Sequence, residues 1–353
     1  MTTARRADPS VFDDARLDDQ QALAAADVPL RRLAESGARV RREVGACAAV
    51  VGQLRSDDAP RAVVAAGADS RLLRAVLEHS CPVPFVAWPG PGLPGWAGSL
   101  DTVVVTAGSA AATSTDEGAI SAVMEAVRRG CGLLIAAAPH SVIAELAAGR
   151  HTTLLPLSSE DPLAAAVVML QAAHALGLGP DIDAESVATA LDDVAVESSP
   201  FLDMVHNPAK ELALLLADAN PVLWGGTVLS ARAARRVAEA LRRATGRSCM
   251  AGDADQLLPV VAHAAPRDVF ADPYDDGAAA MPPALVVLDD GTDDALIREQ
   301  RGRLLSAAST HGVRTGTLVA AHGSPMARYA SLYARGSYAA VYLGVGLRAE
   351  TST

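Results

Sequence analysis

The sequence predicts an α/β fold built from two similar parallel-sheet domains in tandem. Short, continuously apolar strands alternate with helical segments along most of the chain, which is typical of a parallel sheet covered on both faces. An order of strand, turn residues and helix in the first half recurs in the second half. The length of 353 residues suits two domains of about 150 residues each.

Residues 1–58 are predicted to form an N-terminal helical segment, because 37–54 carry apolar residues at helical spacing. Residues 59–179 are predicted to form the first sheet domain. Its expected strands are RAVVAAG (61–67), PVPFVAW (82–88), DTVVVTAGS (101–109), GLLIAAAP (132–139) and HTTLLPL (151–157). Its expected helices cover 69–80, 116–130 and 161–178, and the first has a cap at Asp69 or Ser70.

Residues 180–220 are predicted to form a helical connection between the domains. Pro208 suits the first turn of a helix that Asn207 caps. Residues 221–353 are predicted to form the second sheet domain with the C-terminal helices. Three of its stretches match the first half in order: PVLWGGTVLSARAARRVAEAL (221–241), ALVVLDDGTDDALI (284–297) and RTGTLVAAHGSP (314–325). The Asp-, Pro- and Ala-rich stretch 251–281 is expected to be a long loop.

Composition excludes several classes of protein. The formal net charge of −11 argues against a binder of nucleic acid, which needs a basic face. No run of 18 apolar residues predicts a membrane span, and the first residues do not resemble a signal peptide. Four scattered cysteines indicate reduced thiols in a cytoplasmic protein rather than disulfides or a zinc site: Cys47, Cys81, Cys131 and Cys249. No GxGxxG follows the first predicted strand and GxxxxGK[ST] does not occur, so no nucleotide or other cofactor is expected.

Hydroxyl side chains at strand ends are the strongest candidates for a binding site. Ligands of open parallel sheets bind beyond the carboxyl ends of the strands, and hydroxyls with free N–H groups at a helix start can hold a phosphate. The candidates for binding a phosphate or sugar are Ser70 after the first strand and Ser109, Thr113, Ser114 and Thr115 after the third. The alternative is that these residues only cap helices and form loops.

These features together resemble the bifunctional phosphoglucose/phosphomannose isomerases, which consist of two sugar-isomerase (SIS) domains. The most specific features are NPAKELA (207–213) followed by PVLWGG (221–226), and LYARGSYAAVYLGVGL (332–347) resembles the closing helices of the family. The resemblance covers most of the chain from about residue 60. It implies two flavodoxin-like domains, a sugar-phosphate ligand, aldose–ketose isomerisation of glucose 6-phosphate or mannose 6-phosphate and fructose 6-phosphate, and a homodimer.

The chain departs from the catalytic motifs of that family. The segment matching the family's N-E-N-A-K is MAGDADQL (250–257), which has Gly252 at the glutamate position. The family's motif histidine, its C-terminal lysine and the arginine before the long helix of the first domain have no counterparts here. Isomerisation needs a base, an acid and a positive group. Asp253 or Asp255 is therefore the candidate base, and His263 or His322 the candidate acid.

Three functions remain open: a sugar-phosphate isomerase, active or drifted; a catalytically inactive phosphosugar-binding or regulatory protein; and a structural subunit that uses the fold for association. A DNA-binding regulator is disfavoured because no basic recognition helix is visible.

Lys210 is the only lysine of the chain. In a helix that begins near Asn207, it lies beside the apolar stripe rather than at its centre. We predict that it has a structural role at the domain junction, with its ammonium on carbonyls or a carboxylate of the other domain.

Overall fold

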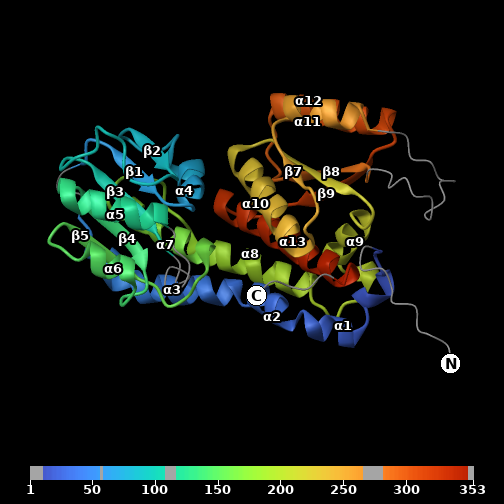
Figure 1. The fold of residues 1–353 in the computed structure, drawn as a ribbon, viewed down its shortest axis with the longest axis horizontal. Coiled ribbons are helices and arrows are strands. Elements are labelled where there is room, and N and C mark those ends of the chain that lie inside the picture. Colours follow the sequence, from blue (N-terminus) through green and yellow to red (C-terminus); the bar gives the residue numbers. More distant parts are fainter. Residues whose placement is uncertain (1–10, 56–58, 108–116, 265–280, 349–353) are drawn as a thin grey trace. The chain divides into compact units, whose positions relative to one another are not determined.

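The computed structural model describes residues 11–55, 59–107, 117–264 and 281–348. The chain divides into two compact units: residues 36–188, and residues 1–35 together with 189–353. Each unit holds one parallel sheet (Figure 1). The α/β class with two tandem parallel-sheet domains is therefore confirmed. No helix in the described part of the chain combines the length and the hydropathy that a membrane crossing needs.

The unit of residues 36–188 has five strands in the order β2-β1-β3-β4-β5, all parallel. The strands are β1 Val63–Ala66, β2 Phe85–Trp88, β3 Thr102–Thr106, β4 Gly132–Ala137 and β5 Thr152–Pro156. The helices are α3 Ser36–Val51, α4 Ser70–Leu77, α5 Glu117–Arg129, α6 Val142–Ala147, α7 Pro162–Ala175 and the start of α8 Ala184–Glu197.

Alternate residues of these strands pack on opposite faces of the sheet. Val103, Val105, Leu133 and Ile135 belong to one apolar cluster with residues of α5 and α6. Helix α7 packs on α3 and also contacts β3 and β4, which places it on the other face. The continuous apolar strands of the sequence reflect this burial on both sides.

The other unit has four strands in the order β7-β6-β8-β9, again parallel. The strands are β6 Asn220–Gly225, β7 Met250–Ala251, β8 Pro283–Asp289 and β9 Arg314–Val319. The helices are η1 Asp14–Leu17, α1 Gln20–Ala25, α2 Asp27–Ala34, η3 Met204–His206, α9 Pro208–Leu215, α10 Val228–Thr245, α11 Ala254–Ala262, α12 Ala295–Thr310 and α13 Pro325–Gly346.

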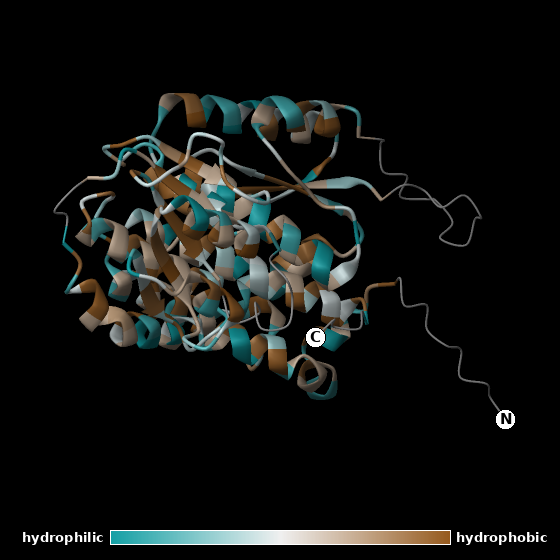
Figure 2. Ribbon diagram, turned by 60° about the vertical axis from the view of Figure 1, so that its left-hand side comes forward, coloured by the Kyte–Doolittle hydropathy of each residue, from teal (hydrophilic) through white to brown (hydrophobic). Residues whose placement is uncertain are grey.

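Helices α11 and α12 cover one face of the second sheet, and α10 and α13 cover the other (Figure 1). Trp224, Leu257 and Leu285 lie in the core under α11 and α12. Helix α12 alternates between hydrophobic and hydrophilic residues along its length, as expected for a helix that packs on one side only (Figure 2). The first described residues pack on α13, where the Asp13 N–H donates to the Gly346 carbonyl at 3.0 Å.

The predicted repeat is confirmed by the strand orders. If β1, β2, β3 and β4 are matched to β6, β7, β8 and β9, both sheets have the same order. The expectation of a long loop at 251–281 is corrected in part, because β7 ends at Ala251 and residues 254–262 form α11. The apolar residues Leu257 and Val261 of α11 are buried against the sheet. Residues 265–280 lie outside the described part.

Candidate functional site: the carboxyl edges of the two sheets

Both sheets reverse their strand order at one point, between β1 and β3 in the first and between β6 and β8 in the second. At such a point the connections leave in opposite directions, so a crevice opens beyond the carboxyl ends of the two strands. The residues that follow β1, β3, β6 and β8 are therefore the ones placed to meet a ligand.

At the first reversal point, Ser70 begins α4 directly after the β1 turn. Gly67 in that turn has φ +89°, a backbone conformation that favours glycine. The Ser70 side chain is fully buried, and its Oγ has no hydrogen-bond partner among the described residues. Buried hydroxyls in native proteins are almost always paired, so this hydroxyl at the carboxyl edge of the sheet is the candidate of the described residues for contact with a ligand.

The other predicted binding residues of this edge, Ser109, Thr113, Ser114 and Thr115, lie outside the described residues. The strand that precedes them, β3, pairs directly with β1, with Ala66 opposite Val105. The residues that follow β3 therefore start next to the β1 turn. Their part in a phosphate site stays a prediction.

At the second reversal point, a carboxylate of the chain itself meets the start of the helix. Thr227 caps α10 in a capping box with Ser230, and its Oγ1 donates to Oδ2 of Asp290 in a short hydrogen bond. Asp290 follows β8 directly, so this bond joins the two strands that flank the reversal point. Arg328 donates from Nη1 to the Asp290 carbonyl at 2.9 Å. The negative charge of Asp290 thus lies beside the capping residue of α10, near a helix start that favours an anion.

A second carboxylate, on α3, contacts the loop that follows β5 of the first sheet. Glu43 of α3 is fully buried, and its two oxygens accept the Ser158 N–H at 2.8 Å and the Ser158 hydroxyl at 2.7 Å. Burial on its own would raise the pKa of Glu43, but the hydrogen bonds from Ser158 outweigh it and lower the pKa. Because both of its oxygens are engaged, this carboxylate fixes the loop after β5 rather than serving as a base.

The predicted catalytic residues lie on α11 and are not brought together. Asp253 caps the start of α11 with 72% of its side chain exposed, 3.6 Å from the guanidinium of Arg235. Asp255 is 81% exposed and lies 3.3 Å from Arg303. His263 follows the last residue of this nine-residue helix, about 15 Å along the axis from Asp253. It is exposed, and its Nδ1 contacts the Pro259 carbonyl at 2.8 Å.

The position of the family's glutamate is occupied by Gly252, between β7 and α11. A Cβ built there would lie 2.8 Å from Oε1 of Gln256, so the start of α11 is already packed against this backbone. Sequence reasoning did not single out Thr227 and Asp290. The sequence does contain a signal for them. Thr227 is a hydroxyl residue just after the strand in 221–241, and Asp290 belongs to an acidic pair at the end of the strand in 284–297, and both stretches match the first half of the chain.

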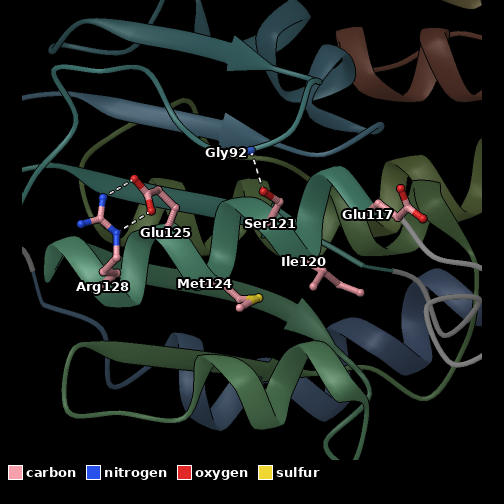
Figure 3. A pocket seen from close by; sticks show the side chains of 7 residues that line it. All are labelled: Gly92, Glu117, Ile120, Ser121, Met124, Glu125 and Arg128. Atoms are coloured by element: carbon pink, nitrogen blue, oxygen red, sulfur yellow. Dashed lines mark hydrogen bonds and ion pairs between the residues drawn. The ribbon is translucent and has the colours of Figure 1, made fainter.

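A separate pocket of about 700 Å³ lies along the outer face of α5 (Figure 3). Four of its lining residues are paired with one another: the Gly92 N–H donates to the Ser121 hydroxyl at 3.0 Å, and Arg128 donates twice to Glu125. These two ion-pair bonds and those from Arg129 lower the pKa of Glu125 to about 2. Since Arg128, the one cation among the described lining residues, is already neutralised by Glu125, this pocket does not suit a sugar phosphate.

Lys210 is fully buried at the start of α9, where Asn207 and Pro208 form the predicted cap and first turn. Its Nζ donates to Asp18 Oδ1 at 2.8 Å, to the Leu202 carbonyl at 2.6 Å and to the Pro200 carbonyl at 3.3 Å. The ammonium also lies 5.6 Å from the centre of the Tyr342 ring. All these partners lie in the unit that contains Lys210, so the ammonium joins three distant segments of one unit.

Comparison with known proteins agrees with the fold described above. Residues 205–350 match the family model described as the bacterial phospho-glucose isomerase C-terminal SIS domain. No curated protein sequence matches the chain.

Among solved structures, the chain is similar to a glucose-6-phosphate isomerase like protein from Thermus thermophilus, with 17% identity, coverage of 93% of this chain and 92% of that one, and a TM-score of 0.52. It is similar to tagatose-6-phosphate ketose/aldose isomerase from Escherichia coli, with 12% identity, coverage of 92% and 93%, and a TM-score of 0.63. It is also similar to glucosamine-6-phosphate deaminase from Thermotoga maritima, with 11% identity, coverage of 90% and 92%, and a TM-score of 0.54.

At these identities the structural likeness shows a common fold and nothing about activity. Together with the match of its second half to the family model, it confirms the predicted resemblance. Residues 205–350 are therefore similar to the bacterial phospho-glucose isomerase C-terminal SIS domain, and the chain shares its fold with the solved phosphosugar isomerase structures.

Proposed function

We propose that the chain binds a sugar phosphate at the carboxyl edge of its first sheet and does not isomerise it. The open hydroxyl of Ser70 carries the proposal, because it is buried at the start of α4, beside the point where the strand order reverses. The phosphate would accept hydrogen bonds from this hydroxyl and from the first N–H groups of α4.

The positions of the candidate groups support the proposal that the chain does not catalyse isomerisation. A base that moves a proton between C1 and C2 must reach the substrate together with an acid and a positive group. Asp253 and Asp255 are mostly exposed, each beside an arginine, and His263 is at the far end of α11. Gly252 supplies no carboxylate at the position where the family has its glutamate.

The ligand class is a hexose 6-phosphate. Two of the similar structures are named for isomerases of such sugars and a third for the deaminase of glucosamine 6-phosphate. Glucose 6-phosphate, mannose 6-phosphate and fructose 6-phosphate are the first compounds to test. The protein is expected to act as a homodimer, which sedimentation analysis would check.

A thermal-shift titration with these three sugars, run beside a coupled assay for fructose 6-phosphate isomerisation, tests the proposal. We expect a rise in melting temperature that depends on sugar phosphate concentration, with no turnover. Turnover that disappears in Asp253→Asn would instead identify an isomerase with Asp253 as its base. No shift and no turnover would favour a structural subunit.

A further inference from the structure

Helices α5 and α6 cover one face of the first sheet, and the exposed apolar side chains of their unit gather on the outer side of this layer. Among the described residues of 36–188, every exposed large apolar side chain lies on α5, on α6 or on the loop before β3: Trp96, Leu100, Met124, Val127, Val142 and Leu146. The described residues of α3, α4 and α7 contribute none. Clustered exposed apolar side chains mark interaction surfaces more often than single ones do.

The two helices and the loop form one continuous surface. Arg129 of α5 donates from Nη1 to the Pro94 carbonyl at 2.7 Å and to the Ala97 carbonyl at 3.0 Å, so the loop that carries Trp96 lies against the end of α5. Helices α5 and α6 contact each other. Val142 and Leu146 are four residues apart and therefore lie on the same side of α6.

Helix α5 carries opposite charges at the two ends of this surface. Glu117 lies in its first turn, and Arg128 lies in its last. They are three helical turns apart, so both lie on the same side of the helix. Ile120 and Met124 lie between them on that side (Figure 3). The outer side of α5 is thus an apolar stripe with an acidic start and a basic end.

The charges at the two ends are not balanced within the chain. The Glu125 carboxylate accepts two hydrogen bonds from Arg128 and one from Arg129, so one carboxylate faces two guanidinium groups. An excess positive charge therefore remains at this end, where Arg128 is 68% exposed. Glu117 is exposed and forms no ion pair with another described residue. The surface thus has one unmatched negative and one unmatched positive charge.

We propose that this face is where two copies of the chain meet, with α5 of one copy antiparallel to α5 of the other. In a contact with two-fold symmetry each surface pairs with itself, so a charge at one end must meet its opposite from the other end. An antiparallel arrangement places Glu117 of each copy opposite Arg128 of the other. Both unmatched charges are then neutralised, which is the argument for a second copy rather than an unrelated partner.

The apolar residues fit the same arrangement. The midpoint between Glu117 and Arg128 and the midpoint between Ile120 and Val127 differ by one position, which is about 1.5 Å along the helix axis. One two-fold axis near Met124 would therefore pair the charges and stack the apolar stripes at once. The inference names the contact surface of the homodimer expected above. It uses none of the residues of the sugar-phosphate site, so either proposal can fail without the other.

Sedimentation velocity of the full chain over a range of concentrations, without sugar phosphate, tests the surface. Wild type should dimerise. Met124→Glu should raise the dissociation constant of the dimer at least about tenfold, because it places two like charges near the axis. Leu296→Glu, at a 61% exposed position on α12 outside this face, is the matched control and should dimerise as wild type does. Circular dichroism checks that both variants are folded, which we expect because both positions are exposed.

A charge exchange tests the antiparallel direction. Glu117→Arg and Arg128→Glu each place like charges opposite one another in a dimer of identical chains, so each should raise the dissociation constant at least about fivefold. In an equimolar mixture of the two variants, opposite charges meet at both ends, and the mixed dimer should be as tight as that of wild type. A folding defect in either variant would not be corrected by mixing.

Three results would overturn the proposal. A wild type that stays monomeric at every concentration would show that the face does not bind a second copy. A dimer that Met124→Glu leaves unchanged would place the contact on another surface. A mixture that dimerises no better than its two components would reject the antiparallel pairing of Glu117 with Arg128.

Discussion

The two sheets have the same strand order and differ in what stands at the point where that order reverses. After β1, the hydroxyl of Ser70 is buried and has no hydrogen-bond partner among the described residues. After β6, the hydroxyl of Thr227 is bonded to Asp290, which follows β8. At equivalent places in the two sheets, one hydroxyl thus has no partner among the described residues and the other is hydrogen-bonded to a carboxylate of the chain.

This difference shows how two sheets of the same topology can differ in whether an anionic ligand has access to the carboxyl edge. An anion at the start of a helix is favourable whether it comes from a ligand or from the chain. Since Asp290 supplies that charge in the second sheet, a phosphate would have to displace a bonded carboxylate there. In the first sheet it would only have to meet a hydroxyl that has no other partner among the described residues.

The largest expected effect concerns the turns that precede the two helices. In Gly225→Ala, the new Cβ would lie 2.3 Å from the backbone carbon of Ser230, and the backbone has little room to move away. We expect a loss of about 3 kcal/mol in the free energy of unfolding, at the upper end for overpacking. Gly67→Ala should cost less, about 1–2 kcal/mol, the cost of a left-handed backbone conformation at its φ of +89°. Urea denaturation of both variants measures the difference. Equal losses would mean that the two turns are constrained alike.

The next effect compares the two hydroxyls directly. Ser70→Ala should weaken hexose-phosphate binding at least tenfold, because a hydrogen bond to a charged group contributes about 1.5–3 kcal/mol. Thr227→Ala is the matched control, and its affinity should equal that of the wild type. Isothermal titration with glucose 6-phosphate measures both. If the Thr227 variant lost affinity and the Ser70 variant kept it, the ligand would belong to the second sheet.

Much of the fold could be predicted from the sequence, because a buried parallel strand produces a run of Val, Ala and Leu that turn residues delimit. The stretches 61–67 and 284–290 were recognised in this way and contain β1 and most of β8. Helix α11 was missed within 251–281, where Pro259 and several aspartates are typical of a loop. Its apolar residues Leu257 and Val261 are buried all the same.

Less of the site could be predicted, since the chemistry of a hydroxyl depends on its partner. Ser70 and Thr227 follow equivalent strands. They differ in that the Thr227 hydroxyl bonds to Asp290, whereas the Ser70 hydroxyl has no partner among the described residues. For Lys210, the position beside the apolar stripe suggested an ammonium on carbonyls or a carboxylate of the other domain, whereas its partners lie in its own unit. No local pattern indicates that Asp18, 192 residues earlier, supplies that carboxylate.

A smaller effect concerns the amino edges of the sheets. Asp101 is buried before β3 and accepts hydrogen bonds from Arg61 Nε at 2.9 Å and from the Gly98 N–H at 2.8 Å. Asp101→Asn should cost about 1.5 kcal/mol in the free energy of unfolding. In the second sheet, Asp218 and Arg314 form a pair that is more exposed, so Asp218→Asn should cost less than about 0.5 kcal/mol.

The same carboxylate predicts a pH dependence. Hydrogen bonds from Arg61 hold the pKa of Asp101 below its usual value, which is about 3.9. Its contribution to stability is therefore fully present above about pH 4 and is lost as the pH falls through the lowered pKa. Urea midpoints measured from pH 6 downward should fall more steeply in wild type than in Asp101→Asn. Parallel curves would show that Asp101 is not a source of acid sensitivity.

The smallest expected effect tests whether Asp290 stands in the place of a ligand. Asp290→Asn keeps the shape of the side chain but removes the charge at the start of α10, a helix of 18 residues. We expect a loss of about 0.5–1 kcal/mol, the range for one charge at a helix end. Inorganic phosphate should then raise the melting temperature of this variant more than that of the wild type, since the position is no longer filled by a carboxylate. Asp293→Asn, in the same loop but paired with Arg298, is the control and should respond to phosphate as the wild type does. If phosphate shifts all three proteins equally, Asp290 does not occupy an anion position, and the contrast between the two edges has to rest on Ser70 alone.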